Sequence, residues 1–173
     1  MSGMLESFCS KVDALNDWTA KIVRWLILPL TLLVTGEVVL RYVFNSPTIW
    51  SLDITVQTFA AFVILGGGYT LLSNGHISVD VLSTRLSLRG RAIVDLVTSV
   101  FFFGGIGMFL WKAAGAAWKS ILVREAMFSY FRPPLYPLRV VIVLGILLLL
   151  LQGIVKFIRD LQTATHSGQV ERL

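Results

Sequence analysis

The sequence predicts an all-α integral membrane protein with four transmembrane helices and an interfacial amphipathic helix between the second and third. Composition is the first observation: 55% of the 173 residues are hydrophobic and 14% are charged, with a mean hydropathy of +0.77. A soluble domain carries about 25% charged residues. Residues 54–75 contain no charged side chain, which is typical of a membrane span. Residues 96–111 and 140–155 are uncharged too, and each reaches span length if one flanking charge extends to the membrane surface.

The predicted spans follow one another in a single membrane domain, residues 1–162. In the first span, Lys21 and Arg24 precede an apolar stretch, as they would in a signal peptide. Pro29 and two charged residues lie inside that stretch, and no small-x-small cleavage site follows it, so we expect the segment to be retained. The spans are residues 18–44, 50–73, 92–119 and 135–159, and residues 163–173 form an expected flexible C-terminal tail.

Two connections between the spans have recognisable patterns. Residues 45–47, Asn-Ser-Pro, predict a tight turn, because Asn and Ser favour turns and proline lacks the N–H of a continuing helix. A connection this short makes the first two spans antiparallel neighbours. Residues 77–88 mix apolar and charged side chains at helical spacings, which favours a helix lying in the headgroup layer.

The basic residues predict the orientation. Placing both termini in the cytoplasm puts nine of the 15 Lys and Arg residues on that side, which favours an N-in, C-in topology. The net charge of +5 therefore indicates topology, and no nucleic-acid partner is expected. Cys9 is the only cysteine, so there is neither an intrachain disulfide nor a CxxC metal or redox site.

Glu37 and Arg41 are charged residues inside the first span, four positions apart with the acid first, which is the better orientation for a helical ion pair. Ionisable residues in a span are often functional, so one interpretation is a proton or ion relay. The alternative is that Arg41 reaches the outer headgroups while Glu37 neutralises it or pairs with a partner subunit. Arg41 lies close to the helix end, which favours this second interpretation.

Trp50 and Asp53 open the second span. Tryptophan suits the membrane interface, and an acid in the first turn of a helix complements the macrodipole. This structural account is sufficient by itself, and docking of a partner is a further hypothesis for the same two residues.

No pattern in the chain predicts an enzyme, a cofactor or a metal site. Axial haem ligands lie deep within helices, whereas His76 is at the end of a span and His166 is in the tail. There is no HExxH, nucleophile elbow or phosphate-binding loop.

The connection before the last span mixes aromatic residues and three prolines with arginines at positions 124, 132 and 139. Arginine and aromatic residues are enriched in binding hot spots. Arg124, Arg132 and Arg139 are therefore candidates for docking a partner protein, and contact with lipid headgroups is the alternative.

The spans lack a pair of interrupted helices and a buried set of acids for coupling ions, so the chain is poorly equipped to transport by itself. An accessory subunit is the better interpretation. Two alternatives remain open: a membrane anchor of a redox enzyme, which would carry haem or quinone, and a small self-sufficient transporter or channel.

Residues 41–47, Arg-Tyr-Val-Phe-Asn-Ser-Pro, followed by Trp50 and Asp53, resemble a signature of the small membrane subunit of tripartite ATP-independent periplasmic (TRAP) transporters. A second match is the segment with Gly75, His76 and Asp80 after the second span. The resemblance covers nearly the whole chain. It departs from the family pattern at position 52, a leucine where a second acid is common, and at 137–139, Pro-Leu-Arg where Pro-x-Gly is common.

The resemblance implies a role in a bacterial or archaeal inner membrane, in contact with phospholipids. It implies a large membrane subunit, expected as a separate chain, that carries an organic acid with sodium by an elevator movement, and a periplasmic substrate-binding protein. The small subunit would widen and anchor the scaffold and contribute to docking of that protein. On this view a corner of the first hairpin either stabilises the hairpin or holds it against the large subunit. The corner consists of Glu37, Arg41, Asn45, Trp50 and Asp53. The substrate and the stoichiometry are not indicated.

Overall fold

The structure, a computed structural model, describes the backbone of residues 3–73 and 88–170 and the side chains of residues 3, 5–73 and 98–162. Within these residues, four helical stretches are long and apolar enough to cross a membrane: Leu5–Tyr42, Ser51–Leu72, Thr98–Leu122 and Tyr136–Gln162. The predicted all-α class with four spans is confirmed. The elements are α1 (Gly3–Val23), the 3-10 turn η1 (Arg24–Leu26), α2 (Ile27–Tyr42), α3 (Ser51–Leu72), α5 (Leu88–Leu122) and α6 (Tyr136–Val170).

The helices extend further than the predicted spans at the end of the molecule that holds both chain termini. Helix formation begins at Gly3, whereas the first span was predicted from residue 18, because polar side chains in α1 lower its hydropathy without breaking the helix. Helix α6 continues to Val170, so the predicted tail, 163–173, is helical as far as that residue. The predicted interfacial helix, 77–88, lies outside the described residues except for its last position.

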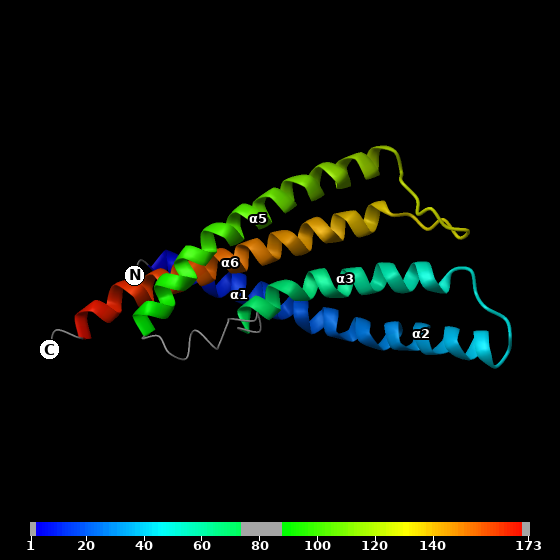
Figure 1. The fold of residues 1–173 in the computed structure, drawn as a ribbon, viewed down its shortest axis with the longest axis horizontal. Coiled ribbons are helices and arrows are strands. Elements are labelled where there is room, and N and C mark those ends of the chain that lie inside the picture. The colour runs from blue at the N-terminus through cyan, green and yellow to red at the C-terminus, as the bar shows by residue number, and fades with distance from the viewer. Residues whose placement is uncertain (1–2, 74–87, 171–173) are drawn as a thin grey trace.

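A single irregular turn separates α1 from α2. Pro29 lacks the N–H that would bond to the carbonyl of Trp25, and its ring crowds the same carbonyl. The backbone responds with the tighter turn Arg24–Leu26 just before α2. All residues flanking this turn keep right-handed helical angles, and α1 and α2 continue along one line in the view of Figure 1.

The four spans stand side by side in an open row (Figure 1). Helix α6 contacts both α5 and α3, α2 contacts α3, and α1 packs against α3 and α6. The loops 43–50 and 123–135 lie together at one end of the row, called here the loop end, and the two chain termini lie at the other, called the terminal end. Helix α6 is therefore the element that joins both halves of the molecule.

Glycines allow α6 to approach its two neighbours. A Cβ atom added at Gly145 would lie 2.8 Å from the carbonyl oxygen of Ile64 in α3, so the two backbones touch there. On the α5 side, a Cβ at Gly153 would lie 2.4 Å from the ring of Phe102. Phe103 stacks edge-on against Phe157 with ring centroids 5.8 Å apart, which fills the space beside this contact.

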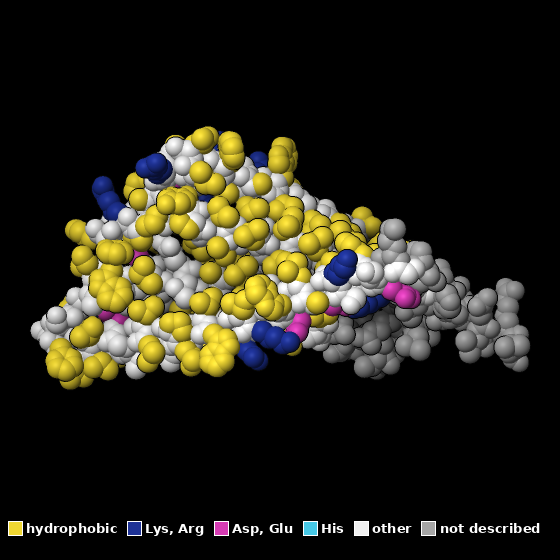
Figure 2. All heavy atoms as spheres, turned by 180° about the vertical axis from the view of Figure 1, so that it is seen from behind, with side chains coloured by type: hydrophobic (Ala, Val, Ile, Leu, Met, Phe, Trp, Pro, Cys, Tyr) yellow, Lys and Arg dark blue, Asp and Glu magenta, His cyan; other side chains and the backbone are white. Residues whose placement is uncertain are grey.

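An open row leaves most apolar side chains uncovered. The accessible surface is 12195 Å², whereas a compact soluble monomer of 19.2 kDa exposes about 8,400 Å². Figure 2 shows hydrophobic side chains spread over the broad middle of one face, with charged side chains toward its margins. Such a surface needs lipid or another membrane protein to cover it.

Replacing Gly145 with alanine tests the close contact of α6 with α3. The added methyl group must displace backbone atoms of Ile64, so we expect the free energy of unfolding to fall by about 1–3 kcal/mol. The measurement is titration with SDS in mixed micelles. Gly115→Ala is the matched control, because its Cβ would meet no atom within 4 Å. Equal stability of the two variants would contradict the packing.

Candidate functional site

Glu37 is the centre of a polar corner at the loop end. One carboxylate oxygen accepts a bond from Arg41 at 2.8 Å. The other accepts bonds from the hydroxyl of Thr48 at 2.5 Å and from its backbone N–H at 3.3 Å. The carboxylate therefore ties the end of α2 to the loop that leads into α3, and the Glu37–Arg41 pair is internal to the chain.

Arg41 keeps much of its guanidinium accessible although it is paired. Its side chain is 52% exposed, compared with 14% for Glu37. An arginine has five N–H donors, and the contact of Arg41 with Glu37 uses only the Nη2 group. The arrangement leaves Arg41 able to bind a phosphate or a carboxylate of another molecule while it holds its place on α2.

Asn45 lies three residues after the end of α2 and has a left-handed conformation, with φ of 51°. The N–H of Ser46 bonds to the carbonyl of Leu40, six residues earlier, at 2.9 Å, which satisfies one of the carbonyl groups left free at the end of the helix. Asparagine tolerates this backbone region better than most residues, and Pro47 follows where the helix cannot continue. Asn45 therefore allows the chain to reverse direction between α2 and α3.

Asp53 joins the corner to the second loop. It is 5% exposed, and its carboxylate accepts a short hydrogen bond from the hydroxyl of Ser129. The same hydroxyl oxygen accepts the N–H of Arg132 at 3.1 Å. Trp50, directly before α3, is 40% exposed and makes no side-chain cap bond. Asp53 thus fastens residues 123–135 to the start of α3.

The loop 123–135 is held as a narrow, folded-back finger. Backbone bonds join Met127 to Pro133 at 2.9 Å and Leu135 to Glu125 at 2.8 Å. The two arginines of the finger, Arg124 and Arg132, and Arg139 at the start of α6 differ in what they contact.

Arg139 is used internally, whereas Arg124 and Arg132 are exposed. The guanidinium of Arg139 bonds to Glu125 at 2.7 Å and to the carbonyl of Ala116 at 3.5 Å, which fixes the finger to the end of α5. Arg124 and Arg132 have φ of 47° and 48° and lie on the surface of the finger.

The tip of the finger presents bare aromatic rings. Phe128 is 104% exposed and Tyr130 is 97% exposed. Together with Ser129 and Arg132 they line a shallow hollow of about 440 Å³. Exposed rings beside an arginine form the kind of surface that partner proteins bury.

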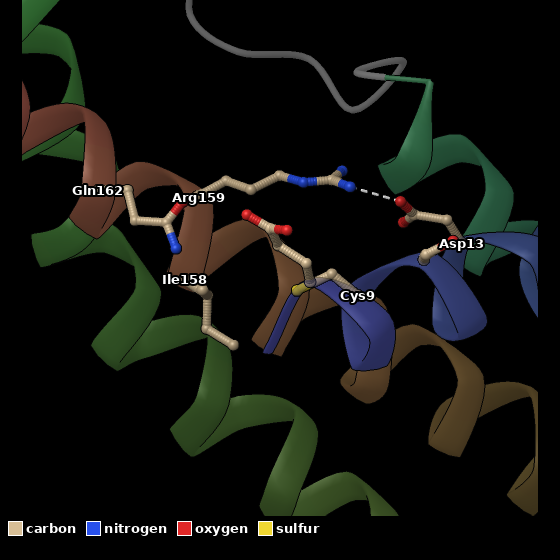
Figure 3. A pocket seen from close by; sticks show the side chains of 7 residues that line it. Cys9, Asp13, Ile158, Arg159 and Gln162 are labelled. Atoms are coloured by element: carbon tan, nitrogen blue, oxygen red, sulfur yellow. Dashed lines mark hydrogen bonds and ion pairs between the residues drawn. The ribbon is translucent and has the colours of Figure 1, made fainter. Parts of the chain in front are cut away.

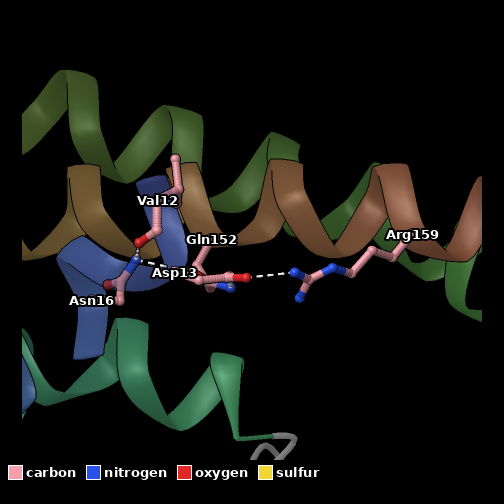
Figure 4. Close-up of polar contacts among 5 residues, drawn as sticks. All are labelled: Val12, Asp13, Asn16, Gln152 and Arg159. Atoms are coloured by element: carbon pink, nitrogen blue, oxygen red, sulfur yellow. Dashed lines mark hydrogen bonds and ion pairs between the residues drawn. The ribbon is translucent and has the colours of Figure 1, made fainter. Parts of the chain in front are cut away.

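A second polar cluster joins α1 to α6 near the terminal end (Figure 4). The amide nitrogen of Asn16 donates to the side-chain oxygen of Gln152 at 2.8 Å and to the carbonyl of Val12 at 3.1 Å. Gln152 donates in turn to Asp13 at 2.9 Å, and Arg159 forms a short ion pair with Asp13. Asn16 and Gln152 are almost fully buried, so they bond to each other in place of water.

Gly68 allows α1 to seat against α3. A Cβ at this position would lie 2.1 Å from the amide oxygen of Asn16. That oxygen is buried without a hydrogen-bond partner among the described atoms. The cluster is therefore packed from two sides, by α6 through hydrogen bonds and by α3 through close approach.

A small cavity of about 360 Å³ lies beside this cluster. Figure 3 shows Arg159 extending from α6 toward Asp13 on α1, with Cys9 and Ile158 on the walls. No group of three or more His, Cys, Asp or Glu side chains able to hold a metal is found within the described residues.

Sequence reasoning found the Glu37–Arg41 pair but not its third member, Thr48, and it missed the partners of Asp53 and Asn16 altogether. These contacts join positions far apart in the chain, for which spacing gives no signal. Thr48 and Ser129 are hydroxyl residues in loops, and no pattern distinguishes them from other loop residues. Gly75, His76 and Asp80, the residues of the second family motif, lie outside the described residues.

The fold and its polar ends define a class: an α-helical membrane protein whose four spans stand side by side in an open row. Residues 30–163, about three quarters of the chain, match the family model described as "Tripartite ATP-independent periplasmic transporters, DctQ component". The chain belongs to this family.

One relative is the C4-dicarboxylate TRAP transporter small permease protein DctQ of Vibrio cholerae serotype O1 (strain ATCC 39315 / El Tor Inaba N16961). It is 33% identical to this chain over 98 residues, which are 56% of this chain and 42% of the relative. The aligned part is therefore less than half of the relative's own length.

A double-mutant cycle on Asn16 and Gln152 tests the α1–α6 cluster. Each alanine substitution alone removes the bond between the two amides and leaves the other side chain buried with one bond fewer, so the two losses of unfolding free energy should not add. We expect a coupling of about 0.5–2 kcal/mol, measured by SDS titration. The control cycle pairs Gln152→Ala with Thr19→Ala, because within the described part of the chain the Thr19 hydroxyl bonds to the carbonyl of Leu15 in its own helix. Additive losses in both cycles would contradict the cluster.

Proposed function

We propose that this chain is the small membrane subunit that widens and anchors the immobile scaffold of a TRAP transporter. Its partner is a large, elevator-type membrane subunit, a separate chain, that imports an organic acid with sodium. A periplasmic substrate-binding protein docks partly on the loop end. C4-dicarboxylates are the first substrates to test, because the relative's name specifies them.

The observation that carries this proposal is the open row of helices. A transporter that works alone encloses a polar path between its helices. Here the charged side chains seen on one face lie toward its margins, while its broad middle presents apolar side chains outward. Such a body offers area to lipid and to a neighbouring subunit, which is the role of a scaffold.

The proposed orientation places the loop end in the periplasm and both termini in the cytoplasm of the inner membrane. It is supported by the excess of basic residues on the terminal side. The exposed rings and arginines of the finger, residues 123–135, then face the compartment in which a periplasmic binding protein would arrive.

The first experiment is recovery of the tagged chain from native membranes in mild detergent, with mass spectrometry of the co-purified proteins. The proposal expects one stoichiometric partner with many spans. A chain recovered alone as a stable oligomer would instead indicate a self-sufficient transporter or channel, and a bound redox cofactor would indicate a redox-enzyme anchor. Either of these results would overturn the proposal.

Arg41→Ala tests the corner as part of the large-subunit interface. Because the accessible guanidinium has donors beyond its bond to Glu37, we expect the co-purified large subunit to fall about tenfold. Arg24→Ala, an exposed arginine near the other end of the first span, serves as the control. Unchanged recovery with Arg41→Ala would remove Arg41 from the interface.

Reversal of both exposed finger arginines, Arg124→Glu with Arg132→Glu, tests docking of the binding protein. We expect its association rate to fall about tenfold at low salt, with a smaller effect at high salt. Arg124→Gln with Arg132→Gln should give an intermediate rate, because it removes charge without reversing it. Rates measured by surface plasmon resonance that stay unaltered would leave these arginines as headgroup contacts.

A further inference from the structure

Helix α1 and the turn η1 that follows it carry an apolar seam that the described residues leave uncovered. Phe8, Leu15 and Ile22 recur every seven residues, and Trp18 and Trp25 each follow three residues after the second and third of them. These five side chains are between 39% and 63% exposed. Apolar residues alternating at spacings of three and four form the a and d positions of a helix that packs along another helix.

The seam is separate from the faces that α1 uses within the chain. Cys9, Val12 and Asn16 are buried on the side toward α6 and α3. Glu6 and Ser10 are exposed on the polar side, next to Asp13 and its ion pair with Arg159. The helix therefore has one face for its own chain, one for water and one apolar seam without a described neighbour.

Lipid tails cannot cover the whole seam, because the first helical stretch is too long. Leu5–Tyr42 has 38 residues and is about 57 Å long at 1.5 Å per residue. The hydrocarbon layer is about 30 Å thick. Even at a tilt of about 40°, it accommodates only about 26 residues, so counting back from Tyr42 places the boundary near Asp17. Phe8 and Leu15 lie beyond it.

The charge of Lys11 indicates which kind of partner helix can pack on the seam. It occupies the d position between Phe8 and Leu15 and is exposed. A second copy of this chain would cross the membrane in the same direction, so its seam would place a second lysine opposite Lys11. That like-charge contact is unfavourable. A partner helix with an acidic residue at this level is favoured instead.

We propose that the seam Phe8–Trp25 binds a helix of the large membrane subunit, with a carboxylate facing Lys11 at the cytoplasmic surface. This inference rests on the proposed function for the identity of the partner. The seam precedes residue 30, where the family match begins, so it lies outside the part of the chain that the family model covers. The partner helix must leave the membrane beside α1, because the seam runs continuously from the aqueous side to Trp25.

Site-specific photo-crosslinking in the assembled transporter tests this contact. p-Benzoylphenylalanine is placed at Leu15 or Trp18 on the seam, and at Ser10 on the polar side as the control. The expected product joins this chain to the large subunit from positions 15 and 18 and is absent from position 10. A product containing two copies of this chain, no product at either seam position, or an equal product at all three would overturn the inference.

Charge reversal gives an independent measurement. Lys11→Glu should reduce co-purified large subunit about tenfold, whereas Glu6→Lys, a reversal on the polar side of the same helix, should leave it unchanged. Lys11 is exposed in the isolated chain, so its replacement does not threaten the fold. If both variants recover the same amount of large subunit, the proposed seam contact is wrong. The proposed function still stands in that case, provided that the wild-type chain co-purifies with the large subunit. Absence of the large subunit from the wild type overturns both.

Discussion

The contact of α6 with α3 at Gly145 determines how the rest of the chain is arranged. Because this glycine has no side chain, α6 lies against the backbone of Ile64, and its opposite side remains available to α5. From that central position α6 presents Gln152 and Arg159 to α1 at one end. At the other end it presents Arg139 to the finger. One helix therefore fixes the row of spans and both polar clusters.

The distribution of polarity explains how such a row can serve as a scaffold. Buried hydrogen bonds toward the two ends hold the helices in register. Such bonds are electrostatically stronger in the low dielectric of the interior than in water. The middle of the row offers apolar area that lipid or a neighbouring subunit can cover without loss of any internal bond. A scaffold must remain still while another part moves. A chain whose ends are fastened by Glu37, Asp53 and Gln152 is suited to that task.

Much of the fold follows from the sequence because hydropathy reports directly on the bilayer. The uncharged residues 54–75 and the turn at Asn45 were sufficient to place the second span beside the first. The helix begins at Gly3, well before the predicted span at residue 18. Asp13, Asn16 and Asp17 look polar in the sequence, while in the fold Asn16 is buried and hydrogen-bonded to α6. Hydropathy averages cannot include a partner that lies 136 residues away.

The polar corner was predictable only in its local part. The spacing of Glu37 and Arg41 implies their pairing, since residues four apart share one face of a helix. The contact of Asp53 with Ser129 joins the start of α3 to the finger, and only the packing of α3 and α6 brings the two together. The sequence placed three arginines in one candidate surface, yet Arg139 bonds to Glu125 within the chain. Which arginines point outward depends on backbone angles that composition does not reveal.

Reconstitution into liposomes tests the central claim, that this chain supports transport without carrying substrate itself. Uptake of a C4-dicarboxylate would be measured with a sodium gradient, for this chain alone and for this chain with the large subunit and the binding protein. The account predicts no uptake by the chain alone and sodium-dependent uptake by the complete set, lost when this chain is omitted. Uptake by the chain alone, or full uptake without it, would contradict the scaffold role.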